Sequence, residues 1–81
     1  MIRHYGNKRP QIDPTAMIAE TAVLIGDVTV GAECSVWYNA VLRGDDQPIV
    51  IGSQTNIQDL AMLHDRVTIG RRVTIGHSVI L

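Results

Sequence analysis

The sequence is poor in aromatic side chains: it holds one Trp, two Tyr and no Phe, or 4% of the chain. A conventional globular core would use more large side chains, whereas a narrow tube lined by one aliphatic residue per rung needs none. A single cysteine, Cys34, excludes an internal disulfide. We expect it to be a small buried hydrophobe in a protein of the reducing cytoplasm.

The chain also has almost no net charge and no long apolar run. The formal net charge is -1 with both signs interspersed, which argues against a nucleic-acid-binding surface. No apolar run approaches the ~18 residues that cross a bilayer, and the first residues lack the apolar segment of a secretion signal. We therefore expect neither nucleic acid nor a membrane among the partners, and one small domain at most.

What the sequence does contain is a repeat with a period of six, and a repeat decides the fold before any other signal. Position one of each hexad is a large aliphatic residue, with one interruption after the sixth: Ile12, Ile18, Leu24, Val30, Val36, Leu42, Ile51, Ile57, Leu63, Ile69, Ile75 and Leu81. Position five is a small residue: Ala16, Ala22, Val28, Cys34, Ala40, Thr55, Ala61, Val67, Val73 and Val79.

A period of six fits a short strand followed by a bend, with position one pointing inward, position two outward and the chain turning near position five. Three such faces close a triangular coil of about eighteen residues, and coils stack at the strand spacing of ~4.8 Å. The hexads over residues 12–81 therefore predict an all-β fold, a parallel β-helix of about four triangular coils. Residues 1–11 form a lead-in segment.

Two departures interrupt the rhythm. Between Leu42 and Ile51 three residues are inserted, and we expect the segment near residues 43–50 to bulge from a corner as a loop that carries function. Leu81 then begins a fresh hexad with no polar closing repeat behind it. Because terminal repeats normally shield the core, we expect the chain to be an N-terminal fragment, truncated within the β-helix.

The register places several polar residues on outward positions. If the insertion leaves the order of faces unchanged, Arg43 and His64 share the third face, while Gln58, Asp59 and His77 lie on the second. The two histidines then diverge from neighbouring faces, so a neighbouring chain is needed to bring both onto one metal ion. Threefold symmetry would make three such sites, with Arg43 of one chain near Asp59 of the next.

Each of these residues also has a plainer interpretation. An outward His on a solenoid is commonly just solvated. Arg43 and Asp45 can form a corner salt bridge that holds the inserted loop, and Asn56 can be a turn or ladder residue. Spacing alone leaves these alternatives open.

The motifs are Val41-Leu42-Arg43-Gly44-Asp45, Thr55-Asn56-Ile57-Gln58-Asp59, Met62-Leu63-His64 and Val73-Thr74-Ile75-Gly76-His77. Together they resemble the γ-class carbonic anhydrase family, and the resemblance runs from about Ile12 to Leu81. The combination is specific, whereas the hexads alone would fit many acyltransferases. The resemblance implies a left-handed parallel β-helix, although crossovers between parallel strands are generally right-handed.

The resemblance also implies a metal site at the interfaces of a homotrimer. In the family three His hold zinc, or iron or cobalt, two from one subunit and the third from its neighbour. His64 matches the first ligand and His77 the ligand that crosses the interface. The remaining ligand is expected immediately after Leu81, one coil beyond His64. Gln58 and Asn56 match the residues that orient the metal-bound water and carbon dioxide.

The same resemblance assigns roles to the charged residues. Arg43 and Asp45 match a pair implicated in subunit contact and catalysis, and Asp59 matches the interface acid that pairs with the Arg. The implied reaction is the reversible hydration of carbon dioxide to bicarbonate by a zinc-bound hydroxide, a lyase activity. The acidic shuttle loop of the most studied type is missing, since Asp65-Arg66-Val67 stands there. With an incomplete His triad, we expect this chain alone to be inactive.

Two alternatives belong to other classes. One is a hexapeptide-repeat acyl- or acetyltransferase, in which a His acts as general base at a subunit groove. The other is a non-enzymatic trimeric β-helix scaffold with a vestigial metal site. Metal content separates the anhydrase from the transferase, and activity of the metal-loaded protein separates it from the scaffold.

Overall fold

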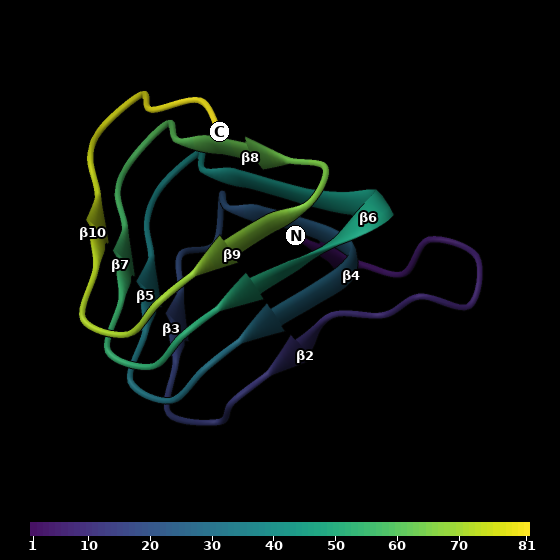
Figure 1. Ribbon diagram of the computed structural model, residues 1–81, viewed down its shortest axis with the longest axis horizontal. Helices are drawn as coiled ribbons and strands as arrows, with labels where there is room; N and C mark the ends of the chain where they lie inside the picture. Colours follow the sequence, from purple (N-terminus) through teal and green to yellow (C-terminus); the bar gives the residue numbers. More distant parts are fainter.

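The computed structural model describes residues 1–81 and shows a parallel β-solenoid of about four turns (Figure 1). It contains no helix, and so none that is long and apolar enough to cross a membrane. The strands are β1 Ile2–Arg3, β2 Gln11–Ile12, β3 Met17–Ile18, β4 Val23–Val30, β5 Ser35–Val36, β6 Val41–Ile51, β7 Asn56–Ile57, β8 Met62–His64, β9 Val67–Ile69 and β10 Thr74–Ile75.

All strand pairs are parallel and form two sheets. One sheet has the order β1-β4-β6-β8, with β2 on β4 and β9 on β6, and the other has the order β10-β7-β5-β3. The four strands of the second sheet run side by side at the left of Figure 1. The all-β parallel solenoid predicted from the hexads is thereby confirmed.

The core is a set of ladders, because residues of equal hexad position stack directly on one another. Leu24 lies opposite Leu42 and Leu42 opposite Leu63, while Val36 lies opposite Ile57. Removal of this aliphatic surface from water is the main stabilising term of such a tube. The buried cluster consists of Ala19, Ala22, Leu24, Val28, Val30, Cys34, Val36, Ala40, Leu42, Ile49, Ile51, Ile57, Ala61 and Leu63.

The chain turns at positions three and four of the hexad, slightly earlier than the expected position five. Non-glycine residues at position four adopt left-handed backbone conformations with φ from 57° to 67°: Glu33, Asn39, Gln54, Leu60, Arg72 and Ser78. Position five is then free to point inward. On the third face the left-handed residue is one position earlier, at Gly26 and Asp65.

The inserted residues lie within strand β6 instead of forming a separate loop. Gly26 pairs with Gly44 and Val28 with Ile49, so residues 45–48 oppose the single residue Asp27 as a wide bulge. The segment returns to the strand because the side chain of Ile49 enters the core, where it is fully buried. Figure 1 shows this bulge as the sharp bend of β6 at the right.

Glycine is required where the bulge begins. A Cβ atom on Gly44 would lie 2.4 Å from the carbonyl oxygen of Asp27, and one on Gly26 would lie 2.5 Å from that of Gly44. These distances are too short for any side chain, so the two backbones can approach only without one. The Arg43-Gly44-Asp45 motif therefore owes its glycine to this close approach.

The first residues pack onto the solenoid as an edge. Ile2 of β1 pairs with Leu24 of β4, and a tight turn follows in which Tyr5 and Lys8 exchange backbone hydrogen bonds of 2.8 and 3.0 Å. The chain then enters the first face at β2. This N-terminal hairpin, residues 5–8, projects beside the bend of β6 and so lies close to the candidate site.

Candidate functional site

The outward ladder predicted on the third face is confirmed by the strand register. Ile25 pairs with Arg43, and Arg43 pairs with His64. The insertion therefore leaves the order of faces unchanged, since its extra residues are absorbed between Gly44 and Ile49. Arg43 and His64 thus project from adjacent rungs of the same sheet.

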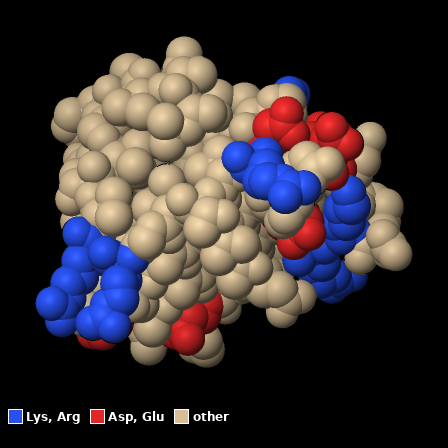
Figure 2. Space-filling model, in the orientation of Figure 1, with Lys and Arg blue, Asp and Glu red and all other residues tan.

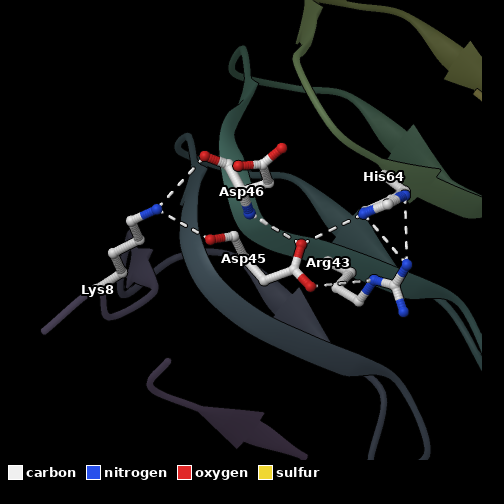
Figure 3. A network of polar contacts seen from close by, with 5 residues as sticks. All are labelled: Lys8, Arg43, Asp45, Asp46 and His64. Carbon is white, nitrogen blue, oxygen red and sulfur yellow. Dashed lines mark hydrogen bonds and ion pairs between the residues drawn. The ribbon is translucent and has the colours of Figure 1, made fainter. Parts of the chain in front are cut away.

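Asp45 joins these two residues in a three-membered cluster (Figure 3). His64 Nε2 lies 3.2 Å from Asp45 Oδ1, and Arg43 Nε lies 3.5 Å from Asp45 Oδ2. Arg43 Nη2 is 3.1 Å from His64 Nε2 and 3.3 Å from His64 Nδ1. The bulge of β6 brings Asp45 to this position, because it turns the strand back across the face that carries His64.

The electrostatics of the cluster favour an ionised Asp45. Partial burial of the carboxyl raises its pKa, but the positive charge of Arg43, the Asp46 backbone N–H and the contact with His64 outweigh burial and lower the pKa below its usual value. The Asp46 N–H donates to Asp45 Oδ1 at 2.9 Å. The ionised Asp45 is therefore an acceptor at neutral pH, and its Oδ1 faces Nε2 of His64.

Both ring nitrogens of His64 face a charged neighbour within the chain. Asp45 Oδ1 lies beside Nε2, and Arg43 Nη2 lies within 3.3 Å of Nδ1 and 3.1 Å of Nε2. Arg43 Nε is buried without a hydrogen-bond partner, since its 3.5 Å approach to Asp45 is an ion pair without hydrogen-bond geometry. A metal ion can bind His64 only if one of these two neighbours turns away.

His77 occupies a different environment on the second face. It lies in the turn after β10, its side chain is 69% exposed, and its Nδ1 is 3.7 Å from Asp59 Oδ1. The Asp59 carbonyl accepts the Ser78 N–H at 3.1 Å, which fixes the backbone of this corner. His77 and Asp59 are thus close but only loosely paired.

The amide residues lie on the same second face. Asn56 sits opposite Ser35, whose hydroxyl donates to Asn56 Oδ1 and accepts the Trp37 indole N–H at 3.0 Å. Gln58 is half-buried on the outward position next to β7, and its side chain forms no hydrogen bond within the chain. The supporting roles of Ser35 and Trp37 were missed from the sequence, although both lie on the same face as Asn56.

The donor types fit a transition metal, but one chain does not complete a site. Imidazoles such as those of His64 and His77 are ligands for zinc, iron and cobalt. The two histidines project from different sheets, and no three potential ligands come together within the chain. The residues present therefore fit part of a ligand set that closes only with further donors.

The surface of the chain has a pocket that includes none of these residues. It is lined by Met1, Ile2, Arg3, His4, Arg9 and Pro10. Figure 2 shows that charged side chains gather on the visible face near the bend of β6 and at the opposite lower corner. The side chains of His64, Asp59 and His77 are at least partly exposed on the outer faces, where a second chain can contact them.

No family model matches the chain, but individual proteins of known sequence and structure do. It is 47% identical over 85 residues to a carbonic anhydrase of Geobacillus kaustophilus, covering 100% of this chain and 47% of that protein. It is 46% identical to the mitochondrial gamma carbonic anhydrase 3 of Arabidopsis thaliana, covering 93% of this chain and 33% of that protein.

A solved structure agrees with the fold. The hexapeptide transferase family protein of Anaplasma phagocytophilum matches with a TM-score of 0.96 and 47% identity, over 99% of this chain and 49% of that one. The chain spans half or less of the length of each of these three proteins. On this similarity of sequence and structure, the chain belongs to the γ-carbonic anhydrase and hexapeptide-repeat family of parallel β-solenoids.

Proposed function

We propose that the protein containing this chain is a γ-carbonic-anhydrase-like metalloprotein that hydrates carbon dioxide reversibly at the interfaces of a cytoplasmic homotrimer. The observation that carries the proposal is the cluster of Arg43, Asp45 and His64 on one outward ladder. In this cluster an ionised carboxylate orients an imidazole that one chain leaves without a complete ligand set. Relatives that are named carbonic anhydrases support the same reaction class.

The metal would be held by His64 of one chain and His77 of its neighbour, with zinc, iron or cobalt as the ion. A third ligand is proposed one coil beyond His64. The backbone supports that position, since His64 N–H donates to Leu81 O at 3.0 Å, and the next residue of a continuing chain would stack on His64. When bound, such a metal supplies a Lewis acid that lowers the pKa of bound water to ~7.

The other residues of the chain orient the reactants. In the trimer Arg43 turns from His64 toward Asp59 of the next chain, which frees His64 for ligation and pairs the guanidinium with a carboxylate. Asp45 retains its contact with Arg43 and the Asp46 N–H. Gln58 and Asn56 place amide dipoles beside the reacting molecules and orient water and carbon dioxide without adding net charge.

The test is the metal content and activity of the trimeric protein. We expect about one metal ion per subunit interface by elemental analysis and rapid hydration of carbon dioxide by stopped-flow measurement. His64→Ala and His77→Ala should each remove both. The 81-residue chain alone should bind zinc only weakly and show no activity. A metal-free protein with full hydration activity would refute the proposal.

A second candidate function is acyl transfer, because the similar protein of Anaplasma phagocytophilum is named a hexapeptide transferase family protein. A His would then remove a proton from the acceptor group at a subunit groove. Release of free coenzyme A from acetyl-coenzyme A, dependent on His64 or His77 and independent of metal, would establish it. Stoichiometric metal with neither activity would indicate the scaffold with a vestigial site.

A further inference from the structure

The N-terminal hairpin makes one long-range contact with the candidate site, through Lys8. The Lys8 ammonium donates to the carbonyl oxygen of Asp45 at 2.9 Å and to that of Asp46 at 3.4 Å, across 37 and 38 residues of sequence (Figure 3). The bonds go to the backbone, and no ion pair joins Lys8 to either carboxylate. Lys8 is half-buried, whereas Asn7 and Arg9 on either side of it are exposed.

The carbonyls that Lys8 contacts lie where the strand ladder is interrupted. Residues 45–48 of the β6 bulge oppose only Asp27 on β4, so regular strand pairing cannot satisfy all of their polar groups. A carbonyl left without a donor in a partly shielded position is unfavourable, because it loses hydrogen bonds to water without gaining one from the protein. An ammonium with three N–H groups is a suitable donor for two neighbouring carbonyls, and its charge strengthens both bonds.

The same two residues hold the carboxylate that orients His64. The Asp46 N–H donates to Asp45 Oδ1, and this oxygen faces His64 Nε2. The geometry of the Asp45–Asp46 peptide therefore decides where the carboxylate lies. Lys8 fixes this peptide from the carbonyl side, while the Asp46 N–H ties it to the carboxylate.

We propose that Lys8 is a positioning residue for the candidate site: it holds the β6 bulge and, through it, the Asp45 carboxylate against His64. A role of Lys8 in catalysis rests on the function proposed above. The coupling of Lys8 to the position of the Asp45 carboxylate does not. The coupling predicts that loss of the Lys8 ammonium loosens one part of the site without altering the solenoid core.

The experiment compares Lys8→Met with Arg9→Met in the 81-residue chain. Both variants lose one positive charge in the same segment, but Arg9 makes no hydrogen bond. In Lys8→Met we expect hydrogen exchange of the Asp46 amide to become about five- to tenfold faster, as for one lost hydrogen bond. The ring nitrogen NMR shifts of His64 should change at constant pH. Lys8→Arg should restore both.

The controls separate positioning from unfolding. The Trp37 amide, bonded to Ile57 O at 2.9 Å on the other sheet, should exchange at the wild-type rate in every variant. If Lys8→Met unfolds the chain, Lys8→Gln, which keeps a neutral donor, should show a smaller change of the same kind. If Lys8→Met and Arg9→Met gave the same Asp46 exchange rate and the same His64 ring nitrogen shifts, the inference would be overturned.

The outcome is independent of the proposed activity. Changes at Asp46 and His64 in the 81-residue chain, together with a trimeric protein that neither binds metal nor hydrates carbon dioxide, would uphold the positioning role and refute the function. Unchanged Asp46 exchange and His64 shifts, together with an active trimeric metalloprotein, would refute the positioning role and uphold the function.

Discussion

The two faces that carry histidine differ in how many contacts the histidine makes within one chain. On the β6–β8 face, His64 is 36% exposed and already meets Asp45 at 3.2 Å and Arg43 at 3.1 Å. On the β7–β10 face, His77 is 69% exposed and has a single acidic neighbour at 3.7 Å. The first face is organised within the chain, and the second presents its groups to a partner.

The difference has a structural cause. The three extra residues of β6 form a bulge that carries Asp45 back across the rung of His64. The second face has no insertion, and its rungs are regular, so side chains of successive coils there stack in ladders, as Ser35 does on Asn56 and Asp59 does beside His77. A solenoid can therefore build a convergent polar cluster where its repeat is broken, whereas a regular face offers ladders.

The largest expected effect comes from breaking the organised face at its glycine. Gly44→Val should destabilise the chain by about 3 kcal/mol or more, because the added Cβ would lie 2.4 Å from a backbone oxygen that cannot move away cheaply. Urea unfolding followed by circular dichroism measures it. Gly70→Val is the matched control, since nothing lies within 4 Å of a Cβ at Gly70, and should stay within about 0.5 kcal/mol.

A second prediction concerns pH and the Asp45 carboxylate of the organised face. The lowered pKa of Asp45 means that its carboxylate stabilises the folded state above the unfolded value of about 3.9, and that this contribution is lost as pH falls through the lower folded pKa. Asp45→Asn should therefore lower stability at pH 7 and leave stability below the folded pKa little changed. Urea unfolding at pH 7 and at strongly acid pH gives the comparison. An equal loss at both pH values would contradict it.

The smallest effect is expected on the regular face. Ser35→Ala removes the hydroxyl that links Asn56 to the Trp37 indole, but Asn56 is exposed and water replaces the lost partner. Stability should fall by about 0.5 kcal/mol or less. The Asn56 side-chain amide signals in NMR should nevertheless broaden or shift, because the amide loses its fixed orientation. Unchanged amide signals would show that Ser35 does not fix the orientation of the Asn56 side chain.

The hexad period was sufficient to predict the solenoid, its ladders and the pairing of Arg43 with His64, because a six-residue rung fixes which residues stack. It did not reveal Ile49 as a core residue, since the bulge places it seven positions after Leu42 instead of four. It also placed the insertion in a loop, because sequence spacing does not show that β6 continues through the bulge.

Of the side-chain contacts of the site, the sequence suggested the Arg43–Asp45 ion pair, which the structure contains, but not the contacts of His64 or Lys8. Lys8 lies outside the repeat and reaches Asp45 across 37 residues, so no spacing rule connects them. The handedness of the helix and the ligand roles of His64 and His77 came from the family resemblance, since neither follows from a repeat length.

The central claim, that His64 and His77 of different chains share one metal, is tested most directly by mixing two variants of the trimeric protein. His64→Ala and His77→Ala should each lack metal and activity. After joint unfolding and refolding in equal amounts, about a quarter of the sites should regain metal, because most trimers are then mixed and each mixed trimer has one interface with both histidines. Recovery of no metal and no activity, with mixed trimers confirmed by native mass spectrometry, would contradict the account.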